Sequence, residues 1–151
     1  MSHPIRPLAD RDRSAWDRLW AGYLAFYRQS LPAATSDETF RRLLAGEQGM
    51  FAFVAVDEDD RPIGLVHALL HASTWAPGGV CYLQDLFVDP DARGGDVARR
   101  LIEAVADEAG HRGAVRVYWR TQQYNGRARS LYDRVARLSS MVTYERDLPA
   151  D

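Results

Sequence analysis

The chain has very little cysteine and no long apolar segment. Its 151 residues include one cysteine, Cys81, so no disulfide can form within the chain, as is usual in the reducing cytoplasm. No apolar run approaches the ~20 residues that span a bilayer. Residues 1–7 lack the basic-then-apolar pattern of a secretory signal. We therefore expect a cytoplasmic protein that is neither secreted nor inserted in a membrane.

A large excess of charge of one sign is also lacking. The formal net charge is −2, so we expect no overall electrostatic attraction to nucleic acid or to an anionic membrane surface. Internal repeats and low-complexity tracts are absent as well. The hydrophobic content of 46% is enough for a packed core. Together these features predict a single folded domain spanning residues 1–151.

The spacing of apolar residues predicts strands and helices in a mixed order. Strands are expected at 5–8, 50–56, 62–71, 80–88, 114–119 and 141–148, and helices at 10–29, 36–45, 97–109 and 125–137. Strands joined by short turns, such as the turn expected at 76–79, are antiparallel, whereas the strand–helix–strand unit at 80–119 is parallel. We therefore predict an α/β fold with a mixed, mostly antiparallel twisted sheet and helices on both of its faces.

Residues 83–98 are the most informative segment. An apolar strand leads through a tight turn and the loop Arg93-Gly94-Gly95 into an amphipathic helix. The first N–H groups of a helix have no partner inside it, so its N-terminus is a natural anion site. The segment predicts a binding site for a diphosphate. A Rossmann dinucleotide site does not fit, because the third glycine and the acidic residue after the next parallel strand are missing.

This organisation, with Arg-Gly-Gly-Asp-Val-Ala at 93–98, resembles the GNAT N-acetyltransferase superfamily. The family signature is Arg or Gln, two residues, Gly, one residue, then Gly or Ala. Asn125, Ala128 and the pair Leu131-Tyr132 resemble the family's second CoA-contacting motif. The resemblance implies a GNAT-like single domain with a splayed parallel strand pair, and acetyl-CoA as the co-substrate.

The same resemblance implies which residues contact CoA. They are Leu86, Phe87, Val88, Arg93, Gly94, Gly95, Asp96, Val97, Ala98, Arg99 and Asn125, the first three through backbone groups that contact pantetheine. Asp96 stands where the family has glycine, and its carboxylate would repel a diphosphate unless Arg93 or Arg99 offsets the charge. Capping of the following helix is an alternative role for Asp96, as it is for Asn125.

Acetyl transfer to an amine needs three things: loss of a proton from the amine, donors for the oxyanion, and a proton for the leaving thiolate. The resemblance implies that Tyr132 is the general acid, since a phenol pKa of about 10 suits a thiolate. Asp85 is the candidate to bind or deprotonate the amine, and an ion pair with an arginine is its alternative role. Gln84 cannot accept a proton, and strand alternation predicts that Gln84 and Asp85 point to opposite faces.

Two histidines and an aromatic stripe are further candidates. His67 and His71 would lie ~13 Å apart along one face of a strand, too far for one metal ion, so we expect no metal site. Either histidine can serve as a base or simply pack on the sheet. Trp16, Trp20 and Tyr23 are spaced as one face of a helix, and they either belong to the core or wall an acceptor pocket through cation–π contact.

Residues 117–132 resemble a GNAT subgroup that contains fungal histone, polyamine and amino-acid acetyltransferases. We therefore expect acetyl transfer to the primary amine of a small amine, polyamine or amino acid, by direct attack in a ternary complex. Cys81 lies away from the expected thioester, which disfavours a covalent intermediate. A protein lysine acceptor and a non-catalytic acyl-CoA-binding module remain alternatives. A homodimer is expected, because dimers are frequent in the superfamily.

Overall fold

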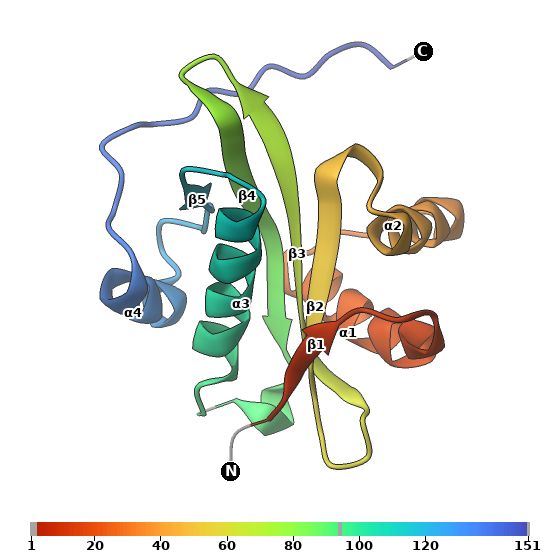
Figure 1. Ribbon diagram of the computed structural model, residues 1–151. Coiled ribbons are helices and arrows are strands. Elements are labelled where there is room, and N and C mark those ends of the chain that lie inside the picture. Colours follow the sequence, from red (N-terminus) through yellow and green to blue (C-terminus); the bar gives the residue numbers. More distant parts are fainter. Residues whose placement is uncertain (1–2, 94, 151) are drawn as a thin grey trace. The chain divides into compact units, whose positions relative to one another are not determined.

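The structure is a computed structural model that describes residues 3–93 and 95–150. The chain divides into two compact units, Met1–Arg120 and Thr121–Asp151. Within the described residues, the first unit contains a five-stranded sheet in the order β1-β2-β3-β4-β5 (Figure 1). The strands are β1 (Ile5–Pro7), β2 (Met50–Val56), β3 (Pro62–Ser73), β4 (Ala76–Val88) and β5 (Val117–Tyr118). Strands β1 to β4 pair antiparallel and β5 joins β4 in parallel, which confirms the predicted mixed sheet.

Helices cover both faces of this sheet (Figure 1). A 3-10 turn, η1 (Asp10–Asp12), leads into α1 (Arg13–Phe26), and α1 and α2 (Ala33–Ala45) pack on one face. The opposite face receives α3 (Val97–His111), whose apolar side contacts Gly64 of β3 through Leu101. The main core lies between α1, α2 and the sheet and includes Trp16, Leu19, Trp20, Phe40, Leu43, Val54 and Leu65.

Several boundaries differ from the sequence prediction. The hairpin between β3 and β4 turns at residues 74–75, because Ser73 already pairs with Ala76. The glycines at 78–79 sit inside β4 instead, where Gly79 has a φ of +76° and a Cβ would lie 2.6 Å from the His71 carbonyl oxygen. Helix α2 begins at Ala33, ahead of Ser36, whose hydroxyl accepts a hydrogen bond from Trp20 rather than capping the helix.

The second unit contains the helix α4 (Gly126–Val135). The carbonyl oxygen of the Asn125 side chain accepts a hydrogen bond from the Ala128 N–H over 3.3 Å, so Asn125 caps α4. The strand predicted at 141–148 is absent from the described chain, and its apolar side chains, such as Met141 and Val142, are exposed. Alternation alone does not make a strand, because strand hydrogen bonds need a neighbouring strand.

No helix among the described residues is long and apolar enough to cross a membrane.

Helix α3 runs through Gly110 and ends before Gly113, whose φ is +91°. Gly113 takes the left-handed conformation after the helix, as glycine does readily because it has no Cβ.

Candidate active site

A β-bulge in β4 shapes the candidate site. His67 of β3 pairs with Asp85 and Ala68 pairs with Leu83, so Gln84 has no partner across the ladder. An extra residue of this kind breaks the strict alternation of side chains and re-aims them. Gln84 and Asp85 both line the pocket at this bulge, and the statement that their side chains face opposite sides of the sheet stays a prediction.

The carboxylate of Asp85 is buried beside His67. Nδ1 of His67 lies 2.9 Å from an Asp85 carboxylate oxygen, and the two residues are only 3% and 9% exposed. Nε2 of His67 lies 3.0 Å from Nε1 of Trp16. An indole N–H can only donate, so Nε2 of His67 is the acceptor and Nδ1 carries the proton that is donated to Asp85. His67 therefore positions Asp85 and has no lone pair left for base catalysis.

Aromatic residues of α1 complete the surroundings of Asp85. The rings of Trp16 and Trp20 stack with centroids 5.6 Å apart, and those of Trp20 and Tyr23 with centroids 5.3 Å apart. Burial, followed by the negative charge of Asp85, raises the pKa of the Tyr23 hydroxyl above its ordinary value. Tyr23 therefore stays protonated next to the carboxylate. The core role predicted for the stripe is confirmed for Trp16 and Trp20, which are both buried, and Trp20 also lines a pocket.

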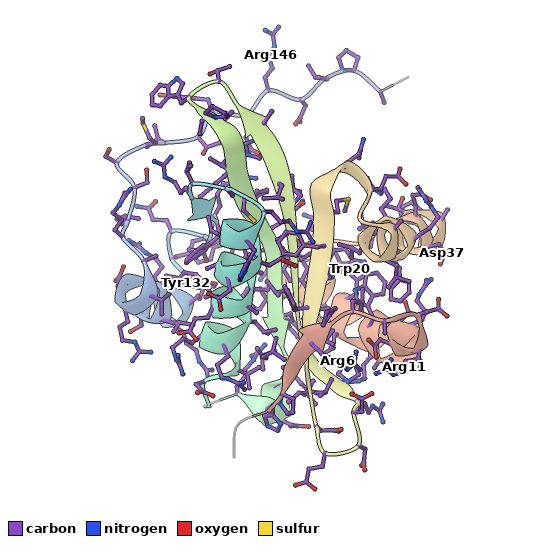
Figure 2. All side chains as sticks on the ribbon, in the orientation of Figure 1. Arg6, Arg11, Trp20, Asp37, Tyr132 and Arg146 are labelled. Carbon is purple, nitrogen blue, oxygen red and sulfur yellow. The ribbon has the colours of Figure 1, made fainter. Side chains whose placement is uncertain are left out.

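The pocket has a volume of about 170 Å³ and lies between α1, α2 and the sheet. Trp20, labelled in Figure 2, forms part of its wall. Its polar lining residues are Thr39, Arg42, His67, Gln84 and Asp85, and its apolar ones are Trp20, Leu31, Leu43, Met50, Ala68 and Leu69. The volume is below the range of about 300–1,000 Å³ that drug-sized ligands occupy. The pocket therefore suits a small molecule that carries polar groups.

The parallel strands β4 and β5 separate after Tyr82, just before the bulge at Gln84. Strands β4 and β5 pair only through Cys81 with Val117 and through Tyr82 with Tyr118. Residues 83–88 of β4 continue past this pairing, and within the described chain no second strand borders them on the β5 side. The main chain of Leu86, Phe87 and Val88 lies in this separated stretch, where an extended ligand can pair with it as a strand would.

Comparison with known proteins identifies this architecture. The sequence matches the Acetyltransferase (GNAT) family over residues 16–136. It is 35% identical over 144 residues to the D-amino-acid N-acetyltransferase HPA3 of Saccharomyces cerevisiae, covering 95% of this chain and 89% of that protein. The chain belongs to the GNAT family. It is an acetyl-CoA-dependent N-acetyltransferase, as the sequence resemblance predicted.

Two further matches, one by sequence and one by structure, cover different shares of this chain. The thialysine N-epsilon-acetyltransferase of Caenorhabditis elegans is 32% identical over 87 residues, which cover 58% of this chain and 51% of that protein. The solved structure of AAC(6')-Iy in complex with the bisubstrate analogue CoA-S-monomethyl-acetylneamine has a TM-score of 0.83 at 18% identity, covering 99% of this chain and all of that one. At that identity the structural likeness shows the GNAT fold alone.

The start of α3 fits the diphosphate of the GNAT co-substrate. The first intrahelical bond runs from the Arg100 N–H to the Asp96 carbonyl, so the preceding N–H groups of Val97, Ala98 and Arg99 have no helical partner. Nothing lies within 4 Å of the place where a Cβ of Gly95 would be, so a ligand can approach this backbone. Gly94, also predicted to bind CoA, lies outside the described residues.

The charged side chains around the start of α3 form ion pairs and hydrogen bonds within the protein. The Asp96 carboxylate makes no capping hydrogen bond and instead pairs with Arg99 over 2.8 Å, so the predicted cap is wrong and the predicted charge offset is present. Arg99 also pairs with Glu103 over 2.6 Å. Arg93 donates from Nε to the Val88 carbonyl over 3.0 Å and lies over the Phe87 ring, which fixes it at the end of β4.

The other residues singled out in the sequence are Tyr132, Ala128 and Cys81. Tyr132 lies on α4 of the second unit (Figure 2), and so does the motif residue Ala128, whereas Asp85 belongs to the first unit. Burial raises the pKa of the Cys81 thiol to about 11. A thiol of that pKa is protonated at neutral pH and is a poor nucleophile, which agrees with the expectation that Cys81 forms no covalent intermediate.

Sequence reasoning missed Arg42 and Thr39 as pocket residues. They stand with Leu43 at the spacing i, i+3 and i+4 on α2, so all three share one face of the helix. The burial of Leu43 shows that this face looks toward the sheet. Helical periodicity therefore held a signal for Arg42.

Proposed function

We propose that this enzyme transfers the acetyl group of acetyl-CoA to the primary amine of a small molecule, by direct attack in a ternary complex. The observation that carries the proposal is the small pocket at the bulge of β4, which the buried Asp85 lines. A primary amine is protonated at neutral pH, and a buried carboxylate is a strong partner for an ammonium group. The pocket thus favours a small cationic acceptor.

The names of similar proteins also support a small-molecule amine as the acceptor. HPA3 is named for D-amino acids, the nematode relative for thialysine, and the bisubstrate analogue bound to AAC(6')-Iy carries an acetylated neamine. Each of these acceptors is a small molecule with an amino group. Polyamines share that chemistry and stay in the proposed range of acceptors.

The co-substrate supplies the acetyl thioester. We assign its diphosphate to the N–H groups that open α3, at Gly95, Val97, Ala98 and Arg99, because a helix N-terminus binds anions. Arg93 adds positive charge there, and Asp96 opposes it. The pantetheine arm then follows the separated backbone of β4 at Leu86, Phe87 and Val88. Asn125 is assigned to CoA on the sequence resemblance alone.

Asp85 and Tyr132 divide the proton transfers. The carboxylate of Asp85 holds the ammonium group and takes its proton, directly or through a water molecule, so that the amine nitrogen has a free electron pair. That nitrogen bonds to the acetyl carbon and the carbon–sulfur bond breaks. The phenol of Tyr132 gives its proton to the departing thiolate sulfur, and the second proton that the nitrogen loses as the amide forms restores the phenol. The net change is one amide formed, one thioester cleaved and one proton passed from amine to protein.

The proposal is tested by calorimetry with acetyl-CoA and then by thiol release against a panel of small amines. The sequence contains no lysine, so acetylation of the enzyme's own lysines cannot contribute to the signal. Binding together with turnover on a small amine supports the proposal. Binding without turnover on any of them overturns it in favour of a protein lysine acceptor or a non-catalytic module, and absence of binding overturns the assignment of the CoA site.

We also propose that the enzyme is a cytoplasmic homodimer. The expectation of a dimer comes from the superfamily and from the general frequency of two-fold pairs. Sedimentation equilibrium at several protein concentrations checks it. A monomer mass at every concentration would contradict it.

A further inference from the structure

The guanidinium of Arg42 lines the acceptor pocket without a protein partner. Its Nε is buried and has no hydrogen-bond partner. Among the described residues, no ion pair within 4 Å involves Arg42, although the carboxylate of Asp85 lines the same pocket. A buried polar atom without a partner is rare and points to a group that the protein alone does not supply.

The neighbouring arginine shows what an ordinary surface position on α2 looks like. Arg41 is exposed and pairs with Glu38 and Glu47. Glu38 is thereby engaged by Arg41, one residue before Arg42 along the helix. The two arginines are therefore opposite cases on one helix: one is satisfied by protein carboxylates, and the other faces a pocket with its donors available.

Opposite charges at one small pocket select for a particular class of acceptor. Asp85 attracts an ammonium group, whereas Arg42 offers the planar donor pattern that binds a carboxylate through two hydrogen bonds. A polyamine or an aminoglycoside would bring further positive charge toward Arg42, which is unfavourable. A molecule that carries one amine and one carboxylate satisfies both groups.

We propose that Arg42 is a specificity-determining residue that binds the carboxylate of the acceptor, so that the acceptor is a small free amino acid. This inference rests on the proposed function, since it concerns the acceptor of the same reaction. The guanidinium holds the carboxylate end against α2 while the amine end lies at Asp85. Neutral Thr39 and Gln84 complete the polar lining between the two charged groups.

The test compares amino acids with their amides, which keep the shape and the α-amine but lose the negative charge. The wild-type enzyme is expected to have the lower KM for the amino acid. Arg42→Gln is expected to reduce kcat/KM for the amino acid by about 10-fold to 100-fold, the range for losing a hydrogen bond to a charged group. Its kcat/KM for the amide should stay close to that of the wild type. Arg42→Lys should restore part of the preference, because it restores the charge.

Arg41→Gln is the matched control. It removes the same charge from the adjacent position, and its kinetics should match those of the wild type. A second measurement needs no variant and no turnover: calorimetry of an N-acetyl amino acid against its amide on the wild-type protein. The acid is expected to bind more tightly.

Three outcomes separate the two proposals. Turnover of amines with equal efficiency for acid and amide would overturn the role of Arg42 and leave the proposed function standing. An equal loss for both substrates in Arg42→Gln would make Arg42 structural only. Failure of the wild-type enzyme to acetylate any small amine would overturn the proposed function itself.

Discussion

The indole N–H of Trp16 points at Nε2 of His67 over 3.0 Å. This contact determines which imidazole nitrogen carries the proton, because the indole cannot accept a hydrogen bond. The proton on Nδ1 is then donated to Asp85, 2.9 Å away. A core tryptophan thus holds the carboxylate of the candidate site in place through a histidine.

The tautomer of His67 is directly measurable. Correlated ¹H–¹⁵N spectra of the imidazole should show a protonated Nδ1 and an unprotonated Nε2. In Trp16→Phe the donor is lost, and an acceptor left without a partner in the core costs about 1–3 kcal/mol of unfolding free energy. Trp20→Phe is the control for the tautomer, since its indole donates to Ser36 instead. A proton on Nε2 in the wild type would contradict the arrangement.

Asp85→Asn removes the proposed proton acceptor while keeping the size of the side chain. We expect kcat to fall by about 10²-fold or more, the usual contribution of a general base. Binding of acetyl-CoA should stay unchanged, because in the proposed function the pantetheine arm contacts the backbone of β4 and not this side chain. Asp17→Asn, on the exposed side of α1, should have normal kcat. Wild-type turnover in Asp85→Asn would show that another group or water takes the proton.

Tyr132→Phe tests the general acid. Loss of the hydroxyl should lower kcat by about 10²-fold or more while the dissociation constant of CoA stays the same. Tyr144→Phe is the control within the second unit, because Tyr144 is 94% exposed. Stopped-flow turnover and calorimetry give the two quantities. Equal turnover in Tyr132→Phe and the wild type would remove Tyr132 from the mechanism.

Asp96→Gly tests the departure from the family signature. Removing the carboxylate from the start of α3 should tighten CoA binding by up to about 1 kcal/mol, the scale of an exposed charge at a helix N-terminus. The loss of the Asp96–Arg99 pair also leaves the guanidinium of Arg99 available to phosphate. Calorimetry at two salt concentrations should show the gain shrinking with added salt. An unchanged dissociation constant would mean that Arg99 already cancels the charge.

The Arg6–Asp12 pair gives a prediction on acid stability. Burial acts to raise the pKa of Asp12, but hydrogen bonds from Arg6 and from the Ala9 N–H outweigh it, so the pKa lies below its ordinary value of 3.8. A carboxyl whose pKa is lowered by folding stabilises the fold above the pKa of the unfolded chain, and this contribution is lost as the pH falls through the folded pKa. The contribution is therefore complete at neutral pH and declines below about pH 3.8.

Asp12→Asn should accordingly lower the unfolding free energy at pH 7 by about 1.5–3 kcal/mol. Arg6 donates two hydrogen bonds of 2.8 Å to the two Asp12 oxygens, and the single amide oxygen of the asparagine can keep only one of that pair. Urea unfolding from pH 7 to pH 2 should show the variant and the wild type converging at low pH. Asp17→Asn, which breaks an exposed pair with Arg13, should cost less than about 1 kcal/mol. A difference that persists unchanged at pH 2 would contradict the assignment.

The sequence alone predicted the family and most of the elements. Local signals sufficed where the cause is local: the apolar run of β2, the glycine that ends α2 with a φ of +69°, and the loop that opens α3. The strand predicted at 141–148 failed, because its apolar alternation says nothing about a partner strand. The hairpin turn was misplaced because the glycines at 78–79 lie inside β4, where they allow the backbones of Gly113 and His71 to approach closely.

What the sequence determined by itself is the chemistry that is available: a strand-borne aspartate, a loop and helix start for a diphosphate, and a tyrosine in a GNAT motif. Only the tertiary structure decided which groups meet. The bulge at Gln84 depends on the register between β3 and β4, and it brings Asp85 to His67 and into the pocket. Arg42 joins them because α2 packs on the same face, which is a contact between residues far apart in the chain. Side-chain periodicity reports local conformation, whereas a site is made by long-range packing.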